Sequence, residues 1–301
     1  LPNFEDRRDF FINWTHTQDS KAHPNKRFSA KVNAGSSSYN QLNSTLSNNY
    51  LKNTLNSNIS YSYSWPDKPF NLTSNIRHSQ NTLNNSLSLS LPDVAFSMTR
   101  INPFERKKAS GKQKWYEKIT IAYNANAKNQ IQTIDSLLFT RQTLNNMRYG
   151  IQHKIPITSS FKVLKHINFS PSANYTERWY FKRIEKSWNE EGLNVDENTT
   201  NGIYTVRDFN TSLRFNTRFF GMYSFKSEKI KALRHVVSPS ISLTYRPDFS
   251  DEKWGYYDSN QIDTLGNEQI YSYYSQGIFG TAPSGQSGNI SFNLDNNIEL
   301  K

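Results

Sequence analysis

The sequence predicts an all-β fold, an antiparallel transmembrane β-barrel segment of about eleven long meander strands. Three observations support this prediction. Apolar residues recur at every second position along almost the whole chain. Several of the predicted strands reach roughly 13 to 20 residues, against about 5 or 6 in an ordinary globular strand. The residues between the apolar ones are mainly Asn, Ser, Thr and Gln, a combination typical of barrels with a wet interior.

The alternation is clearest between Leu55 and Trp65, where apolar side chains alternate with Asn and Ser. Within a later strand the apolar set moves from odd to even positions after Pro92, which predicts a β-bulge there. We expect one antiparallel meander with no helix longer than two turns. In chain order, the pattern predicts strands near residues 10–17, 28–34, 55–65, 70–76, 87–98, 119–125, 149–157, 167–181, 209–219, 237–245 and 290–300.

Composition excludes several protein classes. The chain has 301 residues, of which only 35% are hydrophobic, and this low value resembles that of a disordered chain. Aromatic residues nevertheless make up 14%, whereas disordered chains are poor in aromatics. No apolar run approaches the roughly 20 residues of a membrane-spanning helix. A soluble β-sandwich or a solenoid remains a less favoured alternative to the barrel.

The chain is predicted to be a single partial outer-membrane β-barrel domain over residues 1–301, because no linker, repeat or helical stretch divides it. The sequence starts at Leu1 without the features of a signal peptide and ends inside a patterned segment. We therefore expect a domain truncated at both ends, forming an open part of a larger barrel.

The predicted connections fall into two alternating sets that differ in length and charge. The longer set contains four Lys+Arg and eleven Asp+Glu, and the shorter set contains twelve Lys+Arg and four Asp+Glu. Since outer-membrane barrels have short periplasmic turns and longer outer loops, the shorter set is assigned to the periplasmic side. Basic turns there could face an anionic partner, or they could simply be solvated. Their residues are Arg106, Lys107, Lys108, Lys112, Lys114, Lys226, Lys229, Lys231 and Arg234.

Further cations fall on the polar parity of the predicted strands, where they would line the lumen because charge on a lipid-facing surface is costly. Arginine suits phosphate, since its planar fork can bind two oxygens. The structural alternative is that these residues pair with a lumen carboxylate such as Asp208 or simply hydrate the channel. These candidate contacts for an anionic cargo are Lys154, Arg178, Lys182, Arg214, Arg218 and Arg246.

The sequence contains no recognisable catalytic motif. Its six His are scattered, Cys is absent, and no phosphate-binding glycine loop or nucleophile elbow occurs. We therefore predict neither an enzyme nor a metal or cofactor site. Nucleic-acid binding is not expected either, because the aromatics share a parity with aliphatic residues rather than with Lys and Arg.

Several stretches resemble the barrel of LptD-type lipopolysaccharide assembly proteins. Among them are ISYSYSW at 59–65, LSLPDVAFSM at 89–98, GKQKWYEKI at 111–119 and LRHVVSPS at 233–240. The similarity covers most of the chain, and its motifs are strand and turn signatures. The resemblance implies a non-catalytic outer-membrane translocon component that inserts lipopolysaccharide into the outer leaflet.

The resemblance also implies partners: lipopolysaccharide, membrane lipids, an LptE-like lipoprotein plug, and a periplasmic jelly-roll bridge reached through a missing N-terminal region. The chain departs from the family pattern in lacking a signal peptide, the jelly-roll domain and enough strands to close so large a barrel, so docking and seam residues cannot be transferred to it. Another outer-membrane barrel, such as a porin or substrate-specific channel, is the alternative, followed by a structural or adhesive β protein.

Overall fold

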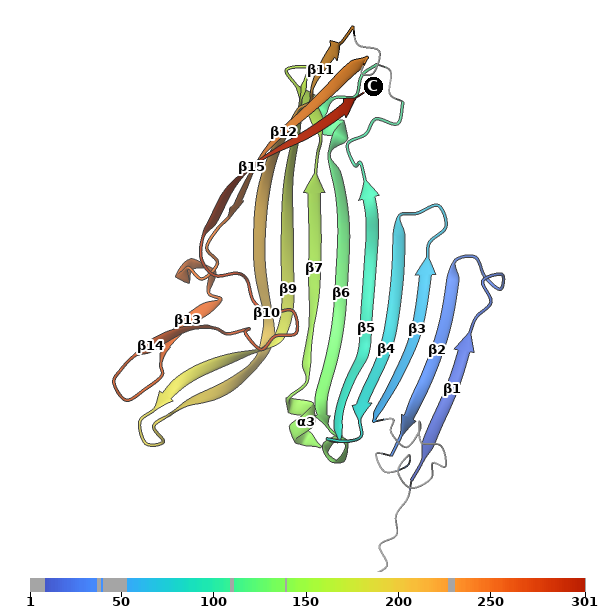
Figure 1. Cartoon of the computed structure of the whole chain (residues 1–301). Coiled ribbons are helices and arrows are strands. Elements are labelled where there is room, and N and C mark those ends of the chain that lie inside the picture. Colours follow the sequence, from blue (N-terminus) through green and yellow to red (C-terminus); the bar gives the residue numbers. More distant parts are fainter. Residues whose placement is uncertain are drawn as a thin grey trace, which may run out of the picture.

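The computed structural model describes residues 9–36, 39, 53–108, 111–138, 140–226 and 231–300, and this part of the chain is almost entirely β-sheet (Figure 1). Thirteen strands form one sheet there. They are β1 (Phe11–Thr17), β2 (Lys26–Gly35), β3 (Thr54–Ser64), β4 (Phe70–Asn81), β5 (Ser86–Ile101), β6 (Thr120–Ile134), β7 (Arg148–Thr158), β8 (Phe161–Val163), β9 (Ile167–Asn189), β10 (Asn194–Asn216), β11 (Phe219–Ser224), β12 (Ala232–Arg246) and β15 (Ser287–Leu300).

The predicted antiparallel meander is confirmed. Strands pair in the order β1-β2-β3-β4-β5-β6-β7-β9-β10-β12-β11, with β8 on β9 and β15 on β12, and all the pairs are antiparallel. Among the described residues, β1 pairs only with β2 and β15 only with β12, so the sheet is open there. The described helical elements are the short α3 (Arg141–Asn145), η1 (Trp115–Lys118), η2 (Asp135–Leu137) and η3 (Glu252–Trp254).

Strand register gathers the apolar side chains on one side of the sheet, called here the apolar face. Phe215 of β10, for example, lies opposite both Phe169 of β9 and Ile241 of β12, and the rings of Phe169 and Phe215 stack with centroids 4.7 Å apart. The predicted bulge at Pro92 is also confirmed, since the pairing of β5 with both neighbours shifts between Ser90 and Asp93. The opposite side of the sheet is called the polar face.

The structure corrects two predicted boundaries. The connection expected between the predicted strands at 167–181 and 209–219 is largely a hairpin, because β9 continues to Asn189 and β10 begins at Asn194. Its outer part is held by cross-strand polar pairs, such as Lys186 with Glu197 at 2.9 Å, which an apolar alternation does not reveal.

The strand expected at 209–219 is interrupted after Asn216. β11 resumes against β12 in the same register, and by that register Pro239 lies opposite Thr217. Proline has no backbone N–H to donate. The ladder therefore keeps the bond from Thr217 N–H to the Pro239 carbonyl (3.2 Å) but lacks its reciprocal.

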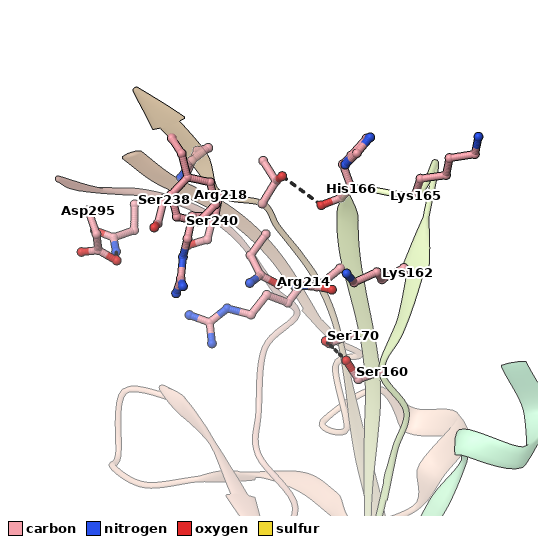
Figure 2. Close-up of a pocket in the computed structure, with 16 residues that line it drawn as sticks. Ser160, Lys162, Lys165, His166, Ser170, Arg214, Arg218, Ser238, Ser240 and Asp295 are labelled. Carbon is pink, nitrogen blue, oxygen red and sulfur yellow. Dashed lines mark hydrogen bonds between the residues drawn. The ribbon is translucent and has the colours of Figure 1, made fainter. Parts of the chain in front are cut away.

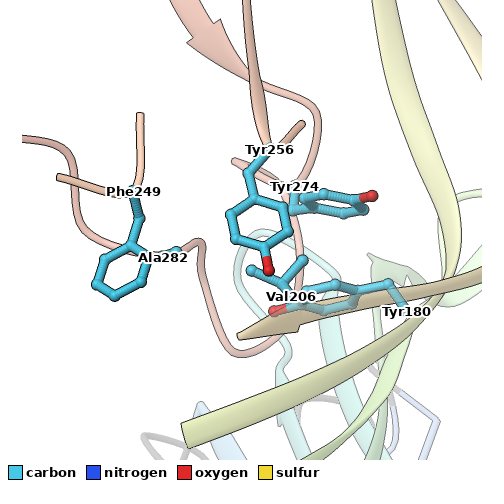
Figure 3. Close-up of a cluster of buried hydrophobic side chains, with 6 residues drawn as sticks. All are labelled: Tyr180, Val206, Phe249, Tyr256, Tyr274 and Ala282. Atoms are coloured by element: carbon cyan, nitrogen blue, oxygen red, sulfur yellow. The ribbon is translucent and has the colours of Figure 1, made fainter. Parts of the chain in front are cut away.

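A long connection between β12 and β15, residues 247–286, is called here the covering loop. It contains η3 and a separate two-stranded sheet of β13 (Tyr257–Gln261) and β14 (Glu268–Ser272). In Figure 1 it lies at the same end of the sheet as the β9–β10 hairpin and α3, away from the end where β11 lies. Its residues pack on β9 and β10 in a buried cluster, drawn in Figure 3, of Tyr180, Val206, Phe249, Tyr256, Tyr274 and Ala282.

Candidate functional site

The six cations predicted for the polar parity all lie on the polar face. Pairing fixes this for β7, β9 and β10, because Lys154 lies opposite Thr176, which in turn lies opposite Asp208. Arg214 is opposite Ser242 of β12, and Arg246 shares that parity. The six residues separate into three pairs by their surroundings, which the sequence did not predict.

Arg214 and Arg218 line a cavity of about 1090 Å³ on the polar face, at the end of the sheet away from the covering loop. This basic cavity is also lined by Lys162, Lys165, His166 and Asp295. Two Arg and two Lys side chains therefore share it with one carboxylate. Figure 2 shows the side chains of Arg214, Arg218 and Lys162 directed toward a common space, whereas that of Lys165 points away. Such an arrangement can hold a multiply charged anion.

The β8–β9 turn brings Lys162 to the cavity. Lys162 lies opposite Asn168, and Leu164 and Lys165 turn the chain with φ of 49° and 66°. The Thr217 hydroxyl donates to the His166 carbonyl oxygen at 3.0 Å, which fixes this turn against the interruption between β10 and β11. Arg218 follows Thr217 directly, so the same contact places Arg218 beside the turn.

The covering loop engages other predicted cations. The Arg178 guanidinium pairs with Asp208, both side chains being 10% exposed, and its Nε donates to the Phe279 carbonyl oxygen at 3.2 Å. Arg246 donates to the carbonyl oxygens of Ser284 and Gly285 at 3.2 and 3.1 Å. Arg178 therefore has the carboxylate partner that the structural alternative expects, whereas Arg246 bonds to backbone carbonyl oxygens of the covering loop.

Lys182 and Lys154 also lie apart from the basic cavity. The Lys182 ammonium donates to the Asn145 carbonyl oxygen at 2.9 Å, at the C-terminal end of α3. Lys154 is exposed on β7, opposite Asn124 and Thr176. Neither residue lines the cavity that contains Arg214 and Arg218.

The base of the covering loop is closed by Asp248. Its Oδ1 accepts hydrogen bonds from the Ser250 amide and hydroxyl and from the Gly285 amide, at 2.8, 2.6 and 2.8 Å. These bonds, that of the Ser250 hydroxyl foremost, hold the pKa of Asp248 below its usual value. Gly277 approaches the Tyr180 ring so closely that a Cβ there would lie 2.8 Å from it. The loop is thus fixed at its base and against the sheet.

Some of the cations predicted for the basic turns have carboxylate partners. Arg106 pairs with Glu117, whose pKa it lowers by a side-chain hydrogen bond, so Arg106 is an anchor of the β5–β6 turn rather than an open charge. Arg234 is not in a turn: it belongs to β12, because that strand begins at Ala232, and it pairs with Glu299 of β15 at 3.2 Å.

The remaining turn residues are exposed. Lys114 lies with its Nζ 5.7 Å from the Tyr116 ring centroid, while Lys229 lies outside the described residues. The exposed turn residues with no such contact within the described part are Lys107, Lys108, Lys112, Lys226 and Lys231.

One pair contradicts the expectation that charge avoids the apolar parity. Glu177 and Arg207 lie opposite one another on the apolar face and are 3.1 Å apart. Tyr175 and Trp179 also donate hydrogen bonds to the Glu177 carboxylate. The Glu177 carboxylate is tolerated on this face because Arg207, Tyr175 and Trp179 all donate to it.

Lys165, His166 and Lys162 were not recognised as site residues from the sequence. The sequence places Lys162 in a short turn, and the positive φ values of Leu164 and Lys165 have no glycine or asparagine to mark them. Only parity could have indicated Lys162, because in a tight hairpin it would lie on the same face of the sheet as Asn168.

Two further features were sought among the described residues: a metal-binding cluster and a membrane-spanning helix. The described residues hold no group of three or more His, Cys, Asp or Glu able to bind a metal ion. Among the helices described, none is long and apolar enough to cross a membrane.

Comparison with known proteins gives a family. No curated protein matches the chain. A family model with the description "LptD protein" matches residues 1–301, in agreement with the resemblance carried by the strand and turn motifs. The chain therefore belongs to the LptD family of outer-membrane lipopolysaccharide-transport proteins.

Proposed function

We propose that this chain forms part of the outer-membrane wall of a translocon that inserts lipopolysaccharide into the outer leaflet without making or breaking covalent bonds. In this proposal residues 1–301 are one barrel domain, the apolar face meets lipid and the polar face lines the lumen. The observation that supports it is the separation of an apolar from a polar face across the sheet, together with a basic cavity on the polar face.

The polar face suits an anionic glycolipid. Its strands carry Asn and Ser, which hydrogen-bond sugars and water, and its cations can pair with phosphate. Arg214 and Arg218 have no carboxylate partner among the described residues, and we assign them the contact with lipopolysaccharide phosphates. Arg178 and Arg246 instead hold the covering loop.

The covering loop favours sideways release. It packs over the polar parity of β9 and β10 at the end with the acidic connections, so cargo moving along the lumen meets a fixed obstacle there. An LptE-like lipoprotein plug and a periplasmic jelly-roll bridge are the partners this role requires. The exposed Lys107, Lys108 and Lys112 are available to an acidic surface of the bridge.

Depletion of the full-length protein tests the function. Newly made lipopolysaccharide should then fail to reach the cell surface and accumulate inside, and plasmid-borne wild-type protein should restore delivery. Normal surface lipopolysaccharide after depletion, accompanied by loss of uptake of a small solute, would instead identify a channel. Photo-crosslinking from position 214 should capture lipopolysaccharide during transport, whereas crosslinking from Ile241 on the apolar face should not give a transport-dependent product.

A further inference from the structure

A second cavity, called here the apolar cavity, opens on the apolar face. Leu213 of β10 and Pro171 of β9 both line it and lie opposite one another on the apolar parity. The other lining residues include the short Ala173 and the larger Trp115 and Phe161. Short side chains between long ones leave a depression in the face of a sheet. Its volume of about 400 Å³ falls within the range of about 300 to 1,000 Å³ for small-molecule sites.

The apolar cavity forms where the regular ladder of β6 and β7 ends. Thr120, the first residue of β6, lies opposite Thr158, the last residue of β7. Beyond this pair the chain forms η1 on one side and β8 on the other. The Trp115 ring of η1 reaches the Phe161 ring of β8, with centroids 6.4 Å apart. The η1 segment thus forms one wall of the cavity and belongs to the β5–β6 connection, which is teal in Figure 1 and lies at the end of the sheet away from the covering loop.

Glu117 fixes this wall in place. Its carboxylate accepts hydrogen bonds from the Lys114 amide at 2.5 Å and from the Arg106 guanidinium at 3.1 Å. Its backbone carbonyl accepts from the Asn102 side chain at 3.4 Å, and Glu117 itself is completely buried. Trp115, two residues before it, is held over the strands by these bonds although it is 61% exposed. The cavity is therefore formed by the chain itself and does not need a ligand to shape it.

Positive charge borders the apolar cavity. The β5–β6 connection over residues 102–119 contains six Lys+Arg and two Glu. Lys114 and Lys118 directly precede Trp115 and Ile119, which line the cavity. Neither lysine forms an ion pair within the part of the chain that the structure describes. A concave carbon surface beside lysines is complementary to a lipid with an anionic headgroup, since acyl carbons leave water and the phosphate meets the ammonium groups.

A hydroxyl in the apolar cavity lacks a partner from the protein. Ser159 lines the cavity, and its buried Oγ forms no hydrogen bond with any described residue. The backbone N–H of Ser159 is satisfied, because it donates to the Pro171 carbonyl oxygen at 3.0 Å. A buried hydroxyl without an acceptor is costly. The ester carbonyl of an acylglycerol supplies such an acceptor, whereas a bare hydrocarbon chain does not.

We propose that the apolar cavity is a binding site for one glycerophospholipid of the periplasmic leaflet. An acyl chain lies along Ala173 toward Leu213, an ester carbonyl oxygen accepts from the Ser159 hydroxyl, and the phosphate contacts Lys114 and Lys118. The lipid then joins η1 to β8, β9 and β10 and steadies the basic turn between β5 and β6. This inference rests on the proposed function, because it takes the apolar face to meet lipid and the basic turns to lie on the periplasmic side.

Lipid titration of the purified full-length protein, followed by native mass spectrometry, tests the site. The probes are phosphatidylglycerol, diacylglycerol with the same chains, and glycerophosphoglycerol, which has no chains and should not bind. A173F fills the cavity with carbon and should weaken phosphatidylglycerol binding about tenfold or more. K114Q combined with K118Q should weaken it by a similar factor and should leave diacylglycerol binding unchanged.

Hydrogen exchange gives a second measurement that depends on where the lipid binds. Phosphatidylglycerol should raise the protection of backbone amides in residues 111–119 of the wild-type protein, because the lipid joins η1 to the strands. A173F should abolish this increase, since the cavity is then occupied by the new side chain.

Matched controls separate a fixed site from general lipid coating. Ala127 is a short residue on the apolar parity of β6, opposite Val94 and Ile151, and A127F adds the same ring outside the cavity. K226Q combined with K231Q removes two exposed lysines from another basic turn. Both controls should leave phosphatidylglycerol binding unchanged. Heat-modifiable gel migration confirms that each variant is folded.

Unchanged phosphatidylglycerol binding in A173F or in the Lys114/Lys118 variant would overturn the inference. An equal loss in the controls would do so too, because the lipid would then coat the surface without a fixed site. Displacement of phosphatidylglycerol by an equimolar amount of lipid A would overturn the choice of a glycerophospholipid. None of these results touches the proposed function, which depends on surface delivery of lipopolysaccharide after depletion and rescue.

Discussion

The ion pair beneath the covering loop allows a quantitative prediction. Arg178 and Asp208 are each 10% exposed in their side chains, and Arg178 also donates to the Phe279 carbonyl oxygen. Asp208→Asn keeps the shape of the side chain but leaves the guanidinium charge buried without a counter-charge. Removing one partner of a buried pair costs about 3 to 5 kcal/mol. We expect that cost to appear as weaker docking of the covering loop.

Hydrogen exchange on the full-length protein measures this docking free energy. A loss of 3 kcal/mol should lower the protection of backbone amides in residues 270–286 about 100-fold, while amides of β3 and β4 should keep theirs. The double variant Arg178→Gln with Asp208→Asn removes both charges and should recover most of the protection. Asp251→Asn breaks only the exposed pair with Lys253 and should change little.

Wild-type protection in the Asp208→Asn variant would refute the reasoning, because it would mean that the pair does not hold the loop. An equally large loss in the double variant would also refute it, since the damage would then come from lost contacts rather than from an unpaired charge.

Three further changes test the faces, the loop and the turn. Leu213→Arg on the apolar face should cost about 2 to 4 kcal/mol near mid-membrane, measured by folding into bilayers, whereas Ser212→Arg on the polar face should be tolerated. Phe249→Ala in the buried cluster should cost about 3 to 5 kcal/mol of loop docking and expose the loop to protease, while Leu265→Ala should not. The lowered pKa of Glu117 means that its ion pair stabilises the β5–β6 turn above about pH 4.5. That protection should be lost as pH falls through the lowered pKa, and Glu117→Gln should lack this pH dependence in hydrogen exchange.

The sheet could be predicted from sequence because the side chains of a barrel strand are apolar on one face and polar on the other. Alternation located the strands, and the shift at Pro92 located a bulge, since a one-residue change of phase has few other causes. Alternation failed where polar cross-strand pairs replace apolar ones, as between Lys186 and Glu197. It also could not show that Pro239 would interrupt the neighbouring strand, because that depends on which residue lies opposite.

The candidate site was predictable only in part. The parity of a residue predicts the face of the sheet on which its side chain lies, but not the groups that the side chain contacts. Arg178 and Arg214 have the same parity, yet one is buried against Asp208 and the other lines an open cavity. The difference comes from the covering loop. Arg178 contacts this loop at Phe279, which is about a hundred residues away in the sequence. The contribution of Lys162 likewise depends on a turn whose left-handed residues are Leu164 and Lys165.

The Glu177–Arg207 pair shows what an unpaired cation on this sheet signifies. On the apolar face, where charge is most costly, Glu177 is satisfied by Arg207 and by donors from Tyr175 and Trp179. The sequence thus supplies a partner for a charge even where the surroundings are least suited to it. Arg214 and Arg218 lie on a face rich in polar side chains, and neither forms an ion pair among the described residues, although Asp295 lines the same cavity. Under the proposed function the phosphates of lipopolysaccharide would supply the counter-charge for these arginines, which photo-crosslinking from position 214 tests.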